Sequence, residues 1–113
     1  MMSEYPSRKF QFWLFRVGHG ELLVRSPRDE ANSLNVDLVF VGVEYADLPR
    51  VLSGVVVTAA SPDEVRRAEE RVGHAVEGST VRVLETEGRR HLVVAAYFNV
   101  EENNLDIGAL PFD

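Results

Sequence analysis

The sequence predicts one α+β domain, in which one amphipathic helix packs on a face of an antiparallel-rich sheet of about six strands. Three observations support this fold class. Short strand-like segments alternate with turn residues, two of these junctions are typical of hairpins, and one segment has both a helix start and a helix stop. The expected order is four strands, the helix and two further strands (β-β-β-β-α-β-β).

The clearest hairpin lies near the start of the chain. Residues 10–17 are rich in aromatic and β-branched side chains, and residues 21–26 form a second apolar run. The turn between them is Gly18-His19-Gly20, in which glycine gives the backbone the freedom to reverse. Pro27 ends the second strand, and the polar residues 28–35 predict a loop.

Two more strands are expected before the helix. Residues 36–45 form the third, and the continuous small apolar run at 55–60 is typical of a strand buried on both faces. The stretch 46–54 between them contains Pro49, which cannot donate a hydrogen bond to a sheet. We therefore expect an irregular connection there.

The helix has a complete set of boundary signals. Ser61 is a good N-cap, Pro62 suits the first helical position, and Glu64 completes a capping box with Ser61. Gly73 is a natural stop. The apolar side chains at helical spacing are Val65, Ala68 and Val72.

A second hairpin is expected after the helix, with strands at 80–86 and 91–100 around a turn at 87–90. Alternate residues of the last strand are all apolar, which predicts one core-facing side. These residues are Leu92, Val94, Ala96, Phe98 and Val100. The opposite side is also too apolar to face water, so we expect the helix, the tail or a second subunit to cover it.

Length and composition indicate a single domain spanning residues 1–113. The chain is 45% hydrophobic, which is enough to form a core. We expect residues 1–9 and 101–113 to be a peripheral lead and tail, although apolar tail residues could dock on the domain. These tail residues are Ile107, Leu110 and Phe112.

Composition also limits the location and the partners. The chain has no cysteine, which excludes disulfides and thiolate sites and favours a reducing, cytoplasmic location. The start lacks the features of a signal peptide, and the apolar runs are far shorter than the roughly 20 residues that span a bilayer. A net charge of −6 disfavours nucleic acid. We expect neither nucleic acid nor membrane as a partner.

No pattern in the sequence predicts catalytic residues, a metal site or a cofactor. The histidines His19, His74 and His91 have no metal-ligand spacing, and the serines lack nucleophile motifs. The junction before the helix has no glycine for binding phosphate, and the acidic run at 101–106 lacks the spacing of a calcium loop. The sequence therefore favours a protein without enzymatic activity.

Candidate binding residues gather around the first hairpin. Trp13, Arg16, His19 and Arg25 lie there in an otherwise acidic chain, and Trp and Arg are enriched at interface hot spots. The alternative is that an arginine simply pairs with Glu21 across the hairpin.

A second candidate group is Tyr45 and Asp47, beside the irregular connection, where a groove could form. The alternative for Asp47 is a turn-forming role ahead of Pro49.

Two functional hypotheses follow. The first is a non-enzymatic protein-binding or homodimerising module, of which one form is an acidic inhibitor or immunity-type protein. One helix is too little to cover the apolar strands, so we expect a homodimer. The alternative is a small-molecule-binding or enzymatic domain with a pocket near Tyr45 and Asp47, which could include His19 or Arg25.

Overall fold

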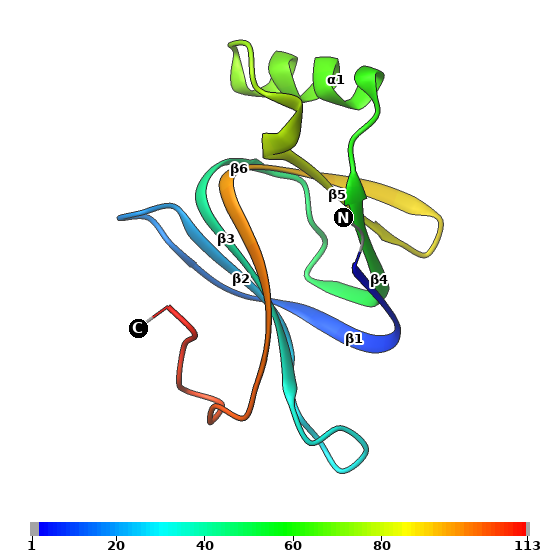
Figure 1. The fold of residues 1–113 in the computed structure, drawn as a ribbon, viewed down its shortest axis with the longest axis vertical. Helices are drawn as coiled ribbons and strands as arrows, with labels where there is room; N and C mark the ends of the chain where they lie inside the picture. Colours follow the sequence, from blue (N-terminus) through cyan, green and yellow to red (C-terminus); the bar gives the residue numbers. More distant parts are fainter. Residues whose placement is uncertain (1–2, 113) are drawn as a thin grey trace.

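The computed structural model describes residues 3–112, in which six antiparallel strands close into a barrel that carries one α-helix (Figure 1). The helix α1 (Pro62–Val72) lies between the fourth and fifth strands, and a short 3-10 turn η1 (Gly78–Thr80) precedes the fifth. The strands are β1 (Ser3–Arg16), β2 (Glu21–Ser26), β3 (Asn35–Ala46), β4 (Val51–Ala59), β5 (Val81–Thr86) and β6 (Arg89–Asn103). The predicted antiparallel α+β character, with this succession of elements, is confirmed.

The barrel order is β1-β2-β3-β6-β5-β4, and pairing of β4 with β1 closes it. Closure was not part of the sequence-based prediction. It lets the six strands bury their inner side chains against one another without a second layer. This core contains Phe10, Leu22, Val24, Val36, Leu38, Phe40, Leu52, Val55, Val57, Leu84, Val93 and Ala95.

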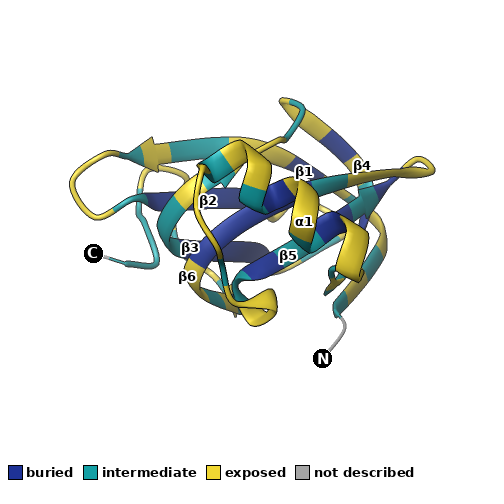
Figure 2. Ribbon diagram, turned by 90° about the horizontal axis from the view of Figure 1, so that it is seen from above, coloured by how far each residue is buried: buried dark blue, intermediate teal, exposed yellow. Residues whose placement is uncertain are grey.

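A smaller core lies outside the barrel, beneath α1. Figure 2 shows the helix lying across buried portions of the strands. The helix contributes Ala68 to this cluster, with Val65 and Val72 packed at its margin. The strands contribute Val81 and Val83 from β5 and Leu92 and Val94 from β6. The predicted apolar side of the helix is therefore the side that packs on the sheet.

The prediction of one core-facing side for β6 is wrong. Leu92 and Val94 pack under α1, Phe98 and Val100 pack against the barrel core, and Ala96 is exposed. Val93 and Ala95, which we expected on the opposite side, belong to the barrel core. The inward–outward alternation of β6 side chains changes near Ala96, where the neighbouring Gly42 of β3 adopts a φ of 71°. The β3–β6 register also shifts close by, between Val43 and Tyr45.

Barrel closure also moves the strand limits. β1 begins at Ser3 instead of Phe10, because its first residues pair with β4, as in Ser3 with Val57. For the same reason β4 already begins at Val51, so the connection before it is shorter than expected. Gly54 has a φ of 74°, and a Cβ there would lie 2.7 Å from the Pro6 carbonyl oxygen. Only glycine fits this close crossing.

The predicted helix boundaries are confirmed. The Glu64 backbone N–H donates to Ser61 Oγ at 3.2 Å, and the Ser61 N–H donates to Glu64 Oε1 at 3.0 Å. Gly73 ends the helix with a φ of 84°. Within residues 3–112, no helix is both long enough and apolar enough to cross a membrane.

The segment after β6 returns across the outer face of the first strands, beside the β1–β2 hairpin (Figure 1). Its Leu105 carbonyl accepts from Asn35 Nδ2 at 2.9 Å, and its Ala109 carbonyl accepts from Arg25 Nη2 at 3.1 Å. Leu23 and Val39 point outward from the barrel and are nevertheless buried. Of the three apolar tail residues, Leu110 and Phe112 are half-buried whereas Ile107 is exposed.

Candidate functional site

Arg25 is the most enclosed of the candidate residues. It lies opposite Asp37 across the β2–β3 pair, and neither side chain is exposed to solvent. Arg25 Nε donates to Asp37 Oδ1 at 2.7 Å, and Nη2 donates to Oδ2 at 2.9 Å. The Trp13 ring lies against this guanidinium, with 5.4 Å between its centroid and Cζ, and Asn103 Nδ2 donates to Asp37 Oδ2 at 2.8 Å. Arg25 therefore does not form an open binding surface.

Arg16 and His19 have different surroundings. Arg16 pairs with Glu21 across the hairpin at 2.8 Å, as the alternative interpretation expected, and it also lies 4.5 Å from the Phe112 ring centroid. His19 is exposed in the turn, where its carbonyl oxygen accepts from the Gly42 N–H at 3.1 Å. The structure thus places Trp13 against Arg25 and brings Arg16 and Arg25 into contact with the tail, whereas His19 lies apart.

Tyr45 and Asp47, the second candidate group, have different surroundings. Tyr45 is half-buried in the small core under α1, and Asp47 is exposed, with its backbone N–H donating to the Leu92 carbonyl at 2.9 Å. The neighbouring Glu44 instead reaches His74 after the helix, with 2.5 Å between Oε2 and Nε2. The pKa of His74 is raised, first by the bond to the Ala75 carbonyl and then by Glu44. From the sequence we considered His74 as a possible metal ligand and missed this pair.

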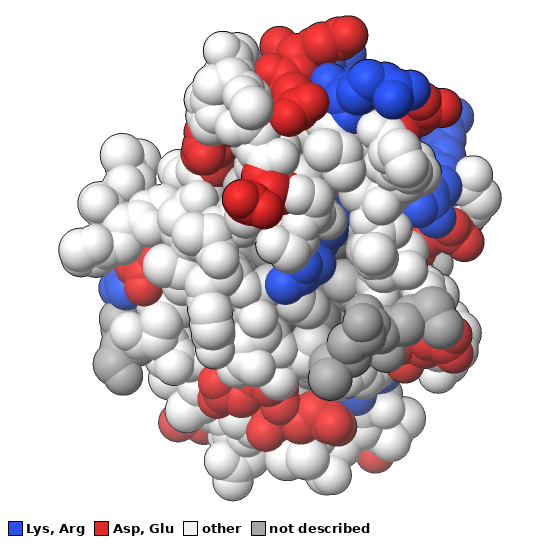
Figure 3. All heavy atoms as spheres, turned by 45° about the horizontal axis from the view of Figure 1, so that its top comes forward, with Lys and Arg blue, Asp and Glu red and all other residues white. Residues whose placement is uncertain are grey.

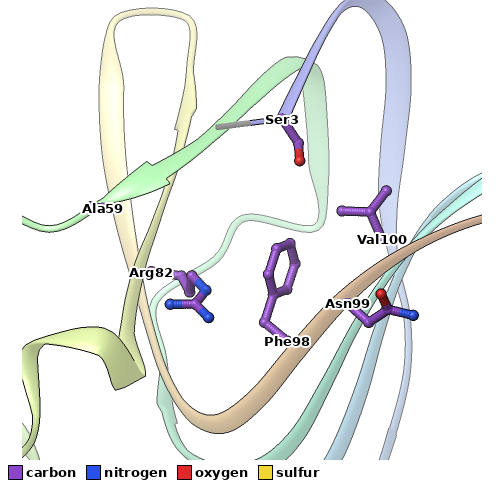
Figure 4. A pocket seen from close by; sticks show the side chains of 6 residues that line it. All are labelled: Ser3, Ala59, Arg82, Phe98, Asn99 and Val100. Atoms are coloured by element: carbon purple, nitrogen blue, oxygen red, sulfur yellow. The ribbon is translucent and has the colours of Figure 1, made fainter. Parts of the chain in front are cut away.

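A cavity of about 300 Å³ lies where β1, β4, β5 and β6 meet (Figure 4). Figure 4 shows the Phe98 ring standing between Ser3 and Arg82, and the Arg82 guanidinium lies 5.3 Å from the ring centroid. Arg82 Nη1 also donates to the Ser79 carbonyl. The lining residues are Ser3, Ala59, Arg82, Phe98, Asn99 and Val100. They come from four separate elements, so no local sequence signal could have grouped them.

A further candidate surface consists of exposed apolar residues along the second half of β1, in the turn after it and at the start of β4. The β1–β2 hairpin that carries most of them projects from the barrel (Figure 1). We define the apolar patch as Phe12, Phe15, Val17 and Val51, whose exposed fractions are 39%, 42%, 83% and 41%. The β1–β4 ladder ends at Gln11 with Val51.

Beyond Gln11, the Phe12 N–H still donates to the Arg50 carbonyl at 2.8 Å. Residues 13–15 then have β2 on one side, and no strand from residues 3–112 pairs with them on the other. This end of β1 is therefore an open strand edge bordered by the apolar patch.

No group of three or more histidine, aspartate and glutamate side chains within residues 3–112 is placed to hold a metal ion. Comparison of the chain with family models, with curated proteins and with solved structures gave no match in any of the three. The functional proposal therefore depends on the geometry alone.

Proposed function

We propose that this domain is a non-enzymatic protein-binding module that forms a homodimer through the open edge of β1. The observation that carries the proposal is the combination of that edge with the apolar patch. Within residues 3–112, four of the seven exposed large hydrophobic residues belong to the patch. Exposed apolar side chains beside an open strand edge are typical of a surface that another chain covers.

The geometry is compatible with a second copy as the partner. An open edge can pair antiparallel with the same edge of another chain, and such a pair is self-complementary about a two-fold axis. Those backbone N–H and C=O groups of residues 13–15 that face away from β2 would supply the pairing, while Phe12 and Phe15 would supply apolar contact area.

The apolar surface left exposed is smaller than the sequence suggested. The sequence suggested that whole strand faces would lie uncovered, but the barrel core, α1 and the tail bury most of these side chains. The exposed large hydrophobic side chains that remain include three on the hairpin, Phe12, Phe15 and Val17. Because this patch is apolar, it favours an apolar partner surface over a basic one.

The acidic-inhibitor form of the hypothesis would use a different surface. Figure 3 shows a row of acidic side chains across the lower part of the face in view, whereas basic side chains gather mainly near α1 at its top. That form, and the cytoplasmic location suggested by the lack of cysteine, remain predictions from the sequence.

Equilibrium sedimentation at micromolar concentration tests the proposal. We expect twice the mass of one chain for the wild type and the mass of one chain for Phe15→Asp, because a charge in the patch opposes burial. The matched control is Ile107→Asp, which changes an exposed residue outside the patch and should leave the dimer intact. A single-chain mass for the wild type across the dilution series would refute the homodimer, as would an unchanged dimer in a folded Phe15→Asp variant.

A second candidate function is supported by the cavity beside Arg82. Its volume is at the small end of the range for ligand pockets, and it combines a cation with an aromatic ring and an apolar wall. These groups suit a small carboxylate with an apolar body. Thermal unfolding in the presence of such carboxylates should show an increased Tm for the wild type and a smaller increase for Arg82→Gln. Equal increases in both proteins would exclude this site.

A further inference from the structure

A second cavity, of about 330 Å³, lies at the margin of the docked tail, and we call it the tail cavity. It brings together the end of β2, the loop that follows, the start of β3 and the tail. Its lining residues are Arg25, Pro27, Arg28, Asn35, Leu105, Asp106 and Ile107. Two of these seven are arginines, in a chain whose net charge is −6.

The inner arginine has one unused donor. Nε and Nη2 of Arg25 bind Asp37, and Nη2 also binds the Ala109 carbonyl. Nη1 is buried and has no hydrogen-bond partner within residues 3–112. A buried charged N–H without an acceptor is costly, and native proteins rarely leave one unpaired. The two N–H groups of Nη1 are therefore without an acceptor within residues 3–112.

The outer arginine is held only weakly. Arg28 Nη2 lies 2.9 Å from Asp106 Oδ1, and the two side chains are 42% and 90% exposed. Solvent-exposed ion pairs contribute little stability, so another anion can replace Asp106 at low cost. The Arg28 backbone is better fixed, because its N–H donates to Asn35 Oδ1 at 2.8 Å. The loop thus places Arg28 at the cavity while its guanidinium can change partner.

We propose that the tail cavity binds a small oxyanion, either a phosphate or a carboxylate group, between Arg28 and Nη1 of Arg25. Both arginines can donate to such a group, and Arg guanidinium is well suited to carboxylate and phosphate geometry. Asp37 already neutralises the charge of Arg25, and the anion competes with Asp106 for the Arg28 guanidinium. Pro27, Leu105 and Ile107 provide an apolar wall for any attached substituent.

Because Nη1 is buried, an anion reaches it only if a neighbouring segment shifts, and the tail is such a neighbour. Among residues 3–112, one hydrogen bond joins the tail to Arg25, from Nη2 to the Ala109 carbonyl oxygen. Binding of the anion is therefore coupled to the position of residues 105–109. This site is separate from the open edge of β1, so the proposal does not depend on the homodimer.

Trp13 provides a direct readout, because it is the single tryptophan of the chain and lies against Arg25. Inorganic phosphate is titrated into the wild-type protein, with sodium chloride at matched ionic strength as the reference, and Trp13 fluorescence is followed. We expect a saturable change with phosphate and none with chloride. A parallel titration with acetate shows whether a carboxylate binds as well.

The variant Arg28→Gln should bind phosphate about tenfold more weakly or not at all, because it loses a charge-assisted contact. The matched control Arg66→Gln removes an exposed arginine of α1 that pairs with Asp63, and should bind as the wild type does. The proposal would be overturned if the Trp13 fluorescence of the wild type changed linearly with phosphate, or changed no more than with chloride. It would also be overturned if Arg28→Gln bound phosphate as tightly as the wild type.

The inner contact is tested without changing Arg25, whose substitution could prevent folding. The side-chain N–H signals of Arg25 in the wild-type protein are followed by NMR during the phosphate titration. We expect them to shift with the same midpoint as the fluorescence change. Signals that stay constant while phosphate saturates Arg28 would remove Arg25 from the site and overturn the proposed two-arginine arrangement.

Discussion

Two arginine–carboxylate pairs in this chain share the same geometry but lie in different surroundings. Arg25 binds both oxygens of Asp37 through Nε and Nη2, and Arg90 binds both oxygens of Glu64 through the same two atoms. The first pair has no exposed side chain, whereas Arg90 is 38% exposed beside a Glu64 that is 9% exposed.

The difference shows that geometry alone does not set the energetic role of an ion pair. Enclosing both charges of Arg25 and Asp37 costs desolvation energy that their attraction offsets only in part. Arg90 stays hydrated, so it can stabilise the Glu64 carboxylate while it joins the first turn of α1 to β6. The buried pair is therefore expected to be costly to break and easy to replace, whereas the other one contributes net stability.

The largest effect is expected for Asp37→Ala, which leaves the Arg25 charge buried without its partner. We expect a loss of about 3 to 5 kcal/mol in the free energy of unfolding, measured by urea denaturation. The double variant Arg25→Met with Asp37→Leu should recover most of this loss, because it removes both charges together. If the double variant is as unstable as the single one, then the pair itself is a net source of stability and the contrast with Arg90 fails.

The Glu64 pair should show a pH dependence. Hydrogen bonds from Arg90 are the main cause that lowers the pKa of Glu64 from 4.5 to about 2. Because the folded pKa is depressed, the stabilisation is complete above about pH 4.5 and is lost as the pH falls toward 2. When complete, this stabilisation adds on the order of 3 kcal/mol to the free energy of unfolding.

Urea midpoints of the wild type and Glu64→Gln between pH 7 and pH 2 measure this effect. The wild type should be the more stable protein at neutral pH, and its advantage should shrink between pH 4.5 and 2. Two parallel curves would mean that Glu64 has an ordinary pKa in the folded protein.

A smaller effect is expected at the same helix end from Ser61→Ala. This change removes the acceptor for the Glu64 N–H and breaks the reciprocal capping box, which should cost about 1 kcal/mol. Thermal or urea unfolding measures it directly. Equal midpoints for variant and wild type would show that Arg90 holds the helix start without help from the cap.

The smallest effect is expected for a third pair, Arg66 with Asp63, which is the most exposed of the three at 68% and 83%. Arg66→Gln should change the free energy of unfolding by no more than about 0.5 kcal/mol. A loss of stability comparable to that from the Glu64 pair would show that solvent exposure does not determine how much each arginine pair stabilises the fold.

The sequence predicted elements whose signals are local. The helix between Ser61 and Gly73 and the two hairpins were recognised because their caps and turns lie within a few residues of the elements they define. The open edge at the first hairpin was only partly anticipated. Trp13 was assigned to an interface there, whereas the exposed aromatic residues are Phe12 and Phe15.

Closure of the barrel and the surroundings of Arg25 could not be predicted in the same way. Both depend on contacts between distant segments, such as Phe10 with Leu52 and Arg25 with Ala109. One signal could have suggested the buried pair. Arg25 and Asp37 carry opposite charges and each lies two residues from a buried apolar side chain, Leu23 and Val39, on neighbouring strands.

The ladder between β3 and β6 also constrains how quickly the chain can fold. It joins Asn35 to Asn103 and Val43 to Ala95, so β4, α1 and β5 all lie within the loop that it closes. A loop of this length must lose its conformational freedom before most of the ladder can form. We therefore expect folding on the millisecond-to-second timescale that is typical of domains dominated by distant strand pairings, although the two hairpins alone could form within about 10 microseconds.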